Sequence, residues 1–157
     1  MRVAVAADHG GFALKQRALD EVRSLGHDPL DCGGAGEPGD DYPDFVRAVA
    51  EAMLAGRAER GVVICGSGVG ASIAASKFPG IRAAVCHDTY SAHQGVEHDD
   101  MNVLCLGGRI VGEELAAELI RAFVGARFTG LERFVRRLAK VEEIEREHRH
   151  FREVSHG

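Results

Sequence analysis

The sequence lacks an apolar run long enough to cross a membrane. Its longest stretch without a charged residue, 61–76, consists largely of glycines and small residues, whereas a transmembrane helix needs about 20 predominantly apolar residues. Residues 1–8 combine one arginine and one aspartate with a short apolar run, which is unlike a secretory signal peptide. We therefore expect a cytoplasmic protein with no membrane partner.

An excess of positive charge is also absent. Lysine and arginine number 19 against 24 aspartates and glutamates, which gives a net charge of -5. Proteins that bind nucleic acid without a dedicated motif depend on basic surfaces. The charge balance therefore predicts no nucleic-acid partner.

Metal-binding and redox spacings are missing as well. Cys32, Cys65, Cys86 and Cys105 stand far apart with no CxxC pair, so neither a zinc ribbon nor a redox dithiol is indicated. The histidines and acids in 87–100 contain no HExxH spacing. We expect no metal and no other cofactor, and we interpret all the cysteines except Cys65 as small core residues.

What remains is ordinary globular composition, with 157 residues, 45% of them hydrophobic and 27% charged. This length corresponds to one domain, which we assign to residues 1–157.

Five β-rich runs alternate with helical patterns. The strands are expected at 3–7, 29–32, 61–65, 82–86 and 103–106, and the helices at 11–25, 42–56, 70–77, 88–97 and 112–124. Nearly apolar strands alternating with helices predict a doubly wound α/β fold, in which a parallel sheet is covered on both faces.

The last third of the chain differs from this pattern. One long amphipathic helix is expected at 131–151, with Phe134, Leu138, Val141 and Ile144 on one stripe. No strand follows it. Such a helix either packs on its own domain or reaches a neighbouring subunit.

The residues after each strand carry the candidate chemistry, because ligands of open parallel sheets bind beyond the carboxyl ends of the strands. Glycines 66, 68 and 70 follow the third strand and precede a helix, an arrangement that exposes amide N–H groups to an anion. Cys65 begins this loop, where the positive end of the helix dipole favours a thiolate. A thiolate beside such amides can remove a proton next to a carbonyl while the amides hold the oxyanion.

Other interpretations of the loop remain open at this point. Asp88 follows the glycine loop by about the interval at which dinucleotide-binding folds place a ribose-binding acid, so a dinucleotide-dependent oxidoreductase is an alternative. A non-catalytic module that binds phosphate or nucleotide is another, and a tight turn without any ligand is the simplest.

Several separated motifs together resemble the type B ribose-5-phosphate isomerase family. They are Asp8-His9-Gly10-Gly11-Phe12 with Lys15, Asp41-Tyr42-Pro43, Cys65-Gly66-Ser67-Gly68-Val69-Gly70, Ser72-Ile73-Ala74-Ala75 with Lys77, Ile81-Arg82-Ala83, Tyr90-Ser91-Ala92, His98, Asn102-Val103-Leu104, and Gly107 with Arg109. The resemblance covers roughly residues 1–145. It implies a five-stranded α/β/α sandwich that acts as a metal-independent aldose-ketose isomerase. It also implies a homodimer with active sites shared between subunits, alone or paired into a tetramer.

The resemblance also implies roles for individual residues. Cys65 would move a proton between C1 and C2 of the sugar, while Ser67 and the amides of Gly66, Gly68 and Gly70 stabilise the enediolate. His98, with Asp8 nearby, would open the sugar ring. The remaining substrate- and phosphate-binding positions would be His9, Tyr42, Asp99, Asn102, Arg109, Arg133 and Arg137, some of them from the partner chain.

Two positions depart from the family pattern. Asp99 stands where many relatives have asparagine, and Phe134 stands where some have histidine. One branch uses a glutamate in the glycine loop as its base, but this chain has Ala71 there and retains Cys65. The resemblance therefore favours the cysteine mechanism. The expected substrate is ribose 5-phosphate, converted to ribulose 5-phosphate, with allose 6-phosphate, galactose 6-phosphate or a tetrulose phosphate as alternatives.

Overall fold

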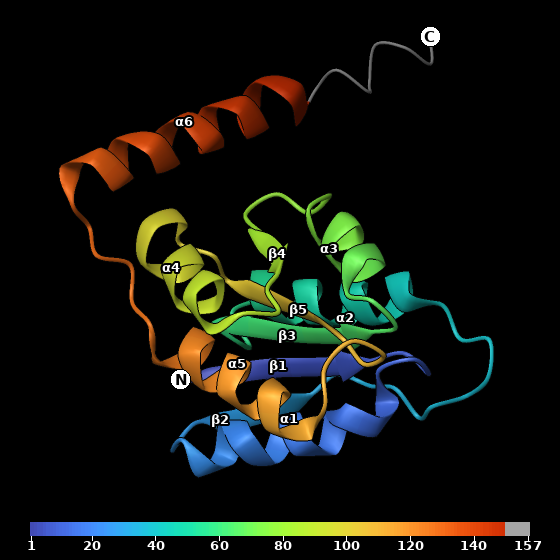
Figure 1. Cartoon of the computed structure of the whole chain (residues 1–157). Coiled ribbons are helices and arrows are strands. Elements are labelled where there is room, and N and C mark those ends of the chain that lie inside the picture. The colour runs from blue at the N-terminus through green and yellow to red at the C-terminus, as the bar shows by residue number, and fades with distance from the viewer. Residues whose placement is uncertain (150–157) are drawn as a thin grey trace, which may run out of the picture.

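The computed structural model describes residues 1–149 and confirms the predicted α/β fold (Figure 1). A five-stranded parallel sheet has the strand order β2-β1-β3-β5-β4. The elements are β1 (Arg2–Ala7), α1 (Phe12–Ser24), β2 (Asp28–Asp31), α2 (Tyr42–Leu54), β3 (Arg60–Cys65), α3 (Val69–Ala75), β4 (Ala83–Val85), α4 (Thr89–Asp99), β5 (Val103–Gly107), α5 (Glu113–Gly125) and α6 (Glu132–Arg149). These bounds lie within two residues of the predicted ones. The predicted end of the last helix, at residue 151, falls outside the described residues.

Alternation along the strands produces the three layers. In β1, Val3 and Val5 face one apolar cluster while Ala4 and Ala6 face the other. The first cluster includes residues of α1, α4 and α5, and the second includes residues of α2 and α3. Each face of the sheet is therefore covered by helices, as nearly apolar strands require.

The strand register brings three strand ends together at the carboxyl edge of the sheet. Ala7 of β1 lies opposite Ile64 of β3, and Cys65 of β3 lies opposite Gly107 of β5. The chain leaves β1 toward β2 on one side, whereas the strands that follow β3 lie on the other side. The carboxyl ends of β1 and β3 thus flank the topological switch point, where open α/β sheets bind ligands.

Helix α6 lies apart from the sheet in Figure 1 and packs against α4. Phe134 is its one buried residue among those described, while Val141 and Ile144 on the same stripe are more than half exposed. The apolar stripe of α6 is thus only partly covered by its own chain. Within residues 1–149, no helix combines the length and apolar character needed to span a membrane.

Glu21 joins two helices on one face of the sheet. Its side chain is almost completely buried, and its carboxylate pairs with Arg17 of α1 and Arg121 of α5, each at 2.9 Å. A buried carboxylate is tolerated only when it is paired and hydrogen-bonded. The two arginines satisfy this requirement and connect α1 to α5.

Candidate active site

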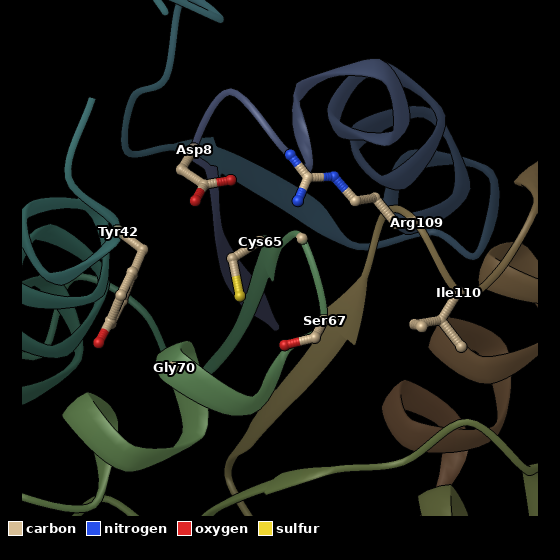
Figure 2. Close-up of a pocket in the computed structure, with 8 residues that line it drawn as sticks. Asp8, Tyr42, Cys65, Ser67, Gly70, Arg109 and Ile110 are labelled. Carbon is tan, nitrogen blue, oxygen red and sulfur yellow. The ribbon is translucent and has the colours of Figure 1, made fainter. Parts of the chain in front are cut away.

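A small pocket opens at the carboxyl edge of the sheet (Figure 2). Its volume is about 300 Å³, and its lining comes from the ends of β1, β3 and β5 and the starts of α2 and α3. The lining residues are Asp8, Tyr42, Cys65, Gly66, Ser67, Gly70, Arg109 and Ile110. The structure therefore brings together most of the residues predicted to follow the strands.

The glycine loop turns tightly around the sulfur of Cys65. Gly68 has a left-handed backbone conformation, with φ at 81°, which glycine adopts without steric penalty. This turn lets the Gly68 N–H donate to Cys65 Sγ at 3.1 Å. The hydroxyl oxygen of Ser67 accepts a hydrogen bond from the Val69 N–H at 3.3 Å. The thiol is thus held beside the backbone amides at the start of α3.

Backbone groups from three strand ends form the floor of the site. The N–H of Gly108 donates to the Cys65 carbonyl at 2.7 Å, and the N–H of Asp8 donates to the Ile64 carbonyl at 3.1 Å. A side chain at Gly108 would collide with the carbonyl of Gly10. The loops after β1, β3 and β5 therefore approach one another backbone to backbone.

Polar side chains form the walls (Figure 2). Asp8 is only 6% exposed, and its carboxylate accepts the N–H of Gly11 at 3.1 Å. The ring of Tyr42 lies so close to Gly70 that a methyl group there would sit 2.7 Å from the ring. Arg109 extends past Gly66 and makes no ion pair within residues 1–149. The pocket thus combines one thiol, one carboxylate, one available guanidinium and backbone N–H groups.

Two other predicted site residues, Asn102 and His98, lie toward the opposite edge of the sheet, where the strands begin. The Gly61 N–H, at the start of β3, donates to the Asn102 carbonyl at 2.9 Å. Cys65 ends the same strand, about 13 Å away at the rise of a parallel strand. Helix α4 starts at the carboxyl edge after β4 and returns, so His98 in its last turn is also remote from Cys65. The resemblance predicts His98 near Asp8, but a single chain does not bring them together.

His98 instead belongs to a cationic cluster formed by α4 and α6. Its imidazole stacks on the ring of Phe134, with centroids 4.0 Å apart, and its Nδ1 bonds Gln94 at 2.8 Å. The guanidinium groups of Arg133 and Arg137 lie 4.5 and 5.9 Å from the centroid of the Phe134 ring. Neither arginine has an ion-pair partner in the described part of the chain. Three groups that can carry positive charge therefore gather around one aromatic ring.

Two further predicted positions lie near this cluster. Asn102 uses its side chain within its own chain, since its Oδ1 accepts the Arg82 N–H at 2.7 Å and its Nδ2 donates to the Gly80 carbonyl at 2.9 Å. These bonds brace the turn before β4. Asp99 is exposed at the end of α4 and lines a groove beneath α6. Neither residue lines the pocket that contains Cys65.

The geometry does not favour dinucleotide binding. β5 lies between β3 and β4, so Asp88 does not follow the strand adjacent to the glycine loop, where a ribose-binding acid belongs. Asp88 instead caps α4 by accepting the Ser91 N–H at 2.7 Å. This hydrogen bond lowers the pKa of the Asp88 carboxyl below its ordinary value.

The other cysteines have structural surroundings. Burial, with a smaller effect of Asp88, raises the pKa of the Cys86 thiol to about 11. Burial also raises the pKa of Cys105, which is completely enclosed. Both confirm the predicted core role, whereas Cys32 is only half-buried, with a pKa that burial likewise raises. Among the four cysteines, Cys65 is the one that lines the pocket.

Two residues near the pocket were not predicted from the sequence. Ile110 lines the pocket although it is 60% exposed, and nothing in its sequence context distinguishes it from a surface residue. Asp40 bonds the ring of His9, which itself lies just outside the pocket lining. Within residues 1–149, Asp8, His9 and Asp40 are the one group of three possible metal ligands whose ligand atoms all lie within 4.8 Å of one another.

The site and fold together define a pocket at the switch point of an open α/β sheet, lined by a thiol, a carboxylate, a guanidinium and backbone N–H groups. Comparison with known proteins is more specific. Residues 3–141 match the sequence profile of the Ribose/Galactose Isomerase family. The chain belongs to this family.

Individual relatives agree with this assignment. The chain is 43% identical to ribose-5-phosphate isomerase B of Escherichia coli over 82% of its length and 87% of that protein. It is 39% identical to D-erythrulose-4-phosphate isomerase of Pectobacterium atrosepticum over 83% of its length and 86% of that protein. The solved structure of ribose-5-phosphate isomerase B from Clostridium thermocellum superposes with a TM-score of 0.90 at 44% identity, covering 94% of this chain and 99% of that one.

Proposed function

We propose that this protein interconverts an aldose phosphate and the corresponding ketose phosphate, with ribose 5-phosphate and ribulose 5-phosphate as its main pair. The observation that carries this proposal is the position of the Cys65 sulfur, which lines the pocket and accepts the N–H of Gly68. The names of the relatives support a sugar-phosphate substrate. The pocket volume of about 300 Å³ suits a ligand of this size.

The proposed reaction moves one proton between neighbouring carbons. The Cys65 thiolate removes the proton from C2 of the open-chain aldose, and the C1 carbonyl oxygen becomes the oxyanion of a cis-enediolate. The amides of Gly66, Gly68 and Gly70 and the hydroxyl of Ser67 stabilise this charge. The thiol then returns the proton to C1, while the hydroxyl proton of O2 passes to O1. Atoms and charge balance without a redox partner.

In this proposal, the cationic cluster of α4 and α6 from another subunit completes the site. His98 would open the furanose ring together with Asp8 of the partner, and Arg133 and Arg137 would bind the phosphate beside Arg109 and His9. Three observations support a homodimer of this kind. His98 and Cys65 lie at opposite edges of one sheet, the two arginines have no ion-pair partner within residues 1–149, and a groove of about 590 Å³ lies between the partly exposed stripe of α6 and residues 81–84.

Tetrulose phosphates are the second candidate substrates, because the relative from Pectobacterium atrosepticum is named for D-erythrulose 4-phosphate. We further propose that the reaction needs no metal, since Cys65 and the amides supply both the base and the oxyanion site. The group Asp8, His9 and Asp40 makes this proposal testable, because its ligand atoms lie close enough to hold an ion.

The test is turnover of ribose 5-phosphate by the purified protein, with and without EDTA. Activity should survive EDTA and fall by about 10³-fold or more in Cys65→Ala, because a positioned general base contributes 10²- to 10⁴-fold. Cys32→Ala is the matched control and should keep wild-type activity. Loss of activity in EDTA would refute metal independence, and full activity of Cys65→Ala would refute the assigned base. Activity on erythrulose 4-phosphate without activity on ribose 5-phosphate would refute ribose 5-phosphate as the substrate.

A further inference from the structure

His9 is held by a single oxygen of Asp40. The backbone N–H of His9 donates to Asp40 Oδ1 at 2.8 Å, and the ring Nδ1 lies 2.7 Å from the same oxygen. Two hydrogen bonds that converge on one atom fix both the backbone and the ring of His9. Because Nδ1 is engaged, Nε2 is the ring nitrogen left for a ligand.

The carboxylate of Asp40 is itself held in place. Asp40 lies in the loop between β2 and α2, and Lys15 fixes this loop by donating to the Gly34 carbonyl at 2.7 Å and bonding Asp31 at 3.1 Å. The side chain of Asp40 is only 13% exposed. Desolvation acts to raise the pKa of Asp40, but the hydrogen bonds from His9 outweigh it and hold this pKa below its ordinary value. A fixed, ionised acceptor therefore faces Nδ1.

We propose that Asp40 is a positioning residue that orients the His9 ring: Nδ1–H donates to Asp40, and the protonated ring donates its Nε2–H to the substrate phosphate. This proposal rests on the phosphate-binding role given to His9 under the proposed function. Asp40 does not touch the substrate itself, since its second oxygen is buried and has no hydrogen-bond partner within the described residues. What Asp40 supplies is a hydrogen-bond acceptor at a fixed place, so an amide oxygen there should serve almost as well as a carboxylate.

Four single variants and one double variant, His9→Ala with Asp40→Ala, separate this role from a general effect of charge or loop stability. Asp40→Ala removes the acceptor, Asp40→Asn retains it, and His9→Ala removes the oriented ring. Glu37→Ala is the matched control, because Glu37 is an exposed acid in the same loop whose side chain makes no interaction within residues 1–149. Steady-state kinetics with ribose 5-phosphate and calorimetric titration with inorganic phosphate are measured for each variant.

Asp40→Ala should raise both KM and the Kd for phosphate about tenfold, the effect of losing one hydrogen bond to a charged group. Its kcat should stay within about twofold of wild type, because uniform binding is lost and transition-state chemistry is not. Asp40→Asn and Glu37→Ala should stay near wild type. In a His9→Ala background, Asp40→Ala should add nothing.

A direct readout does not depend on catalysis. In ¹⁵N spectra of the substrate-free protein at alkaline pH, the neutral His9 ring should carry its proton on Nδ1 in wild type and in Asp40→Asn, and should lose this preference in Asp40→Ala. An unchanged tautomer in Asp40→Ala, or an Asp40→Ala effect that persists without His9, would overturn the proposal. A wild-type protein with the expected tautomer and phosphate affinity but without pentose turnover would instead refute the proposed substrate.

Discussion

The imidazole of His98 stacks on the ring of Phe134, with centroids 4.0 Å apart and ring planes inclined by 16°. Phe134 is 3% exposed and is the one residue of α6 that is buried among those described. This contact therefore anchors α6 to α4. It also fixes the place of Arg133 and Arg137, whose guanidinium groups lie near the same ring.

Phe134→Ala tests the anchor. The substitution should lower the free energy of unfolding by about 3 kcal/mol, the lower part of the range for removing a buried phenylalanine. It should also raise KM for the sugar phosphate, because the two arginines lose their support. Urea unfolding and steady-state kinetics measure the two effects. Phe134→Leu, which keeps most of the apolar volume, should lose about half as much stability; equal stability of Phe134→Ala and wild type would contradict the anchoring role.

Mixing two inactive variants tests the shared site. Cys65→Ala and His98→Ala should each have little activity alone. If a site takes Cys65 from one chain and His98 from the other, each mixed dimer keeps one intact site. After unfolding and refolding together, random pairing in a twofold-symmetric dimer should restore about one quarter of wild-type activity.

The same mixing experiment has an internal control. Cys65→Ala refolded with Cys65→Ala should regain nothing, and size-exclusion chromatography with light scattering should give the mass of a dimer or a tetramer. No recovery in the mixture of the two variants, despite normal assembly, would show that His98 and Cys65 do not act across the interface.

Removing the buried carboxylate of Glu21 should lower the free energy of unfolding more than removing one of its two arginine partners. Glu21→Ala should destabilise the fold by about 2 kcal/mol, because charge-assisted hydrogen bonds on both sides are lost. Arg121→Ala should cost less, about 1 kcal/mol, because Arg17 still pairs with Glu21 at 2.9 Å. Thermal and urea unfolding measure both. A larger loss in Arg121→Ala than in Glu21→Ala would contradict this ranking.

The environment of His27 predicts a specific pH dependence of stability. Burial, and then the N-terminal ammonium, Arg127 and Arg60, lower the pKa of His27 below 6.5 in the folded state. Below pH 6.5, His27 is therefore protonated more readily in the unfolded chain than in the folded chain. The free energy of unfolding thus decreases as the pH falls from 6.5 toward the lowered pKa of the folded state. Above pH 6.5 the residue is neutral in both states and has no such effect.

His27→Gln should remove this component of acid sensitivity. The difference between the unfolding free energies of variant and wild type should be constant above pH 6.5 and should shift in favour of the variant as the pH falls. Urea unfolding at a series of pH values measures it. Parallel curves for the two proteins across the whole range would show that His27 does not resist protonation in the folded state.

Much of the fold follows from local sequence signals. Apolar strands bounded by glycines and polar residues predict every strand, and the glycines at 66, 68 and 70 predict the loop that holds Cys65. Local signals do not predict that the candidate site residues are divided between the carboxyl ends and the amino ends of the strands. This division depends on the direction in which α4 runs back along the sheet. Motif order alone places His98 after Asp8 without revealing the sheet between them.

Individual side chains were harder to predict. Asn102 looks like a ligand-binding amide in sequence, yet its bonds to Arg82 and Gly80 arise from two backbone segments that meet only in the folded chain. Asp40 looks like one of several loop acids, and its bond to His9 spans 31 positions. Such long-range pairings leave no periodic or spacing signal.

The floor of the pocket is made of peptide groups from three loops that touch one another. A side chain at Gly108 would strike Gly10, and one at Gly107 would meet the backbone of Ser67. A side chain at either glycine would therefore force these loops apart. We therefore expect a new substrate preference to arise from Tyr42 or Ile110, whose side chains line the pocket, or from the side chains that a second chain would contribute in the proposed shared site. The contacting loops after β1, β3 and β5 thus constrain the residues that hold Cys65, whereas the side chains around the pocket can change and alter which sugar phosphate is preferred.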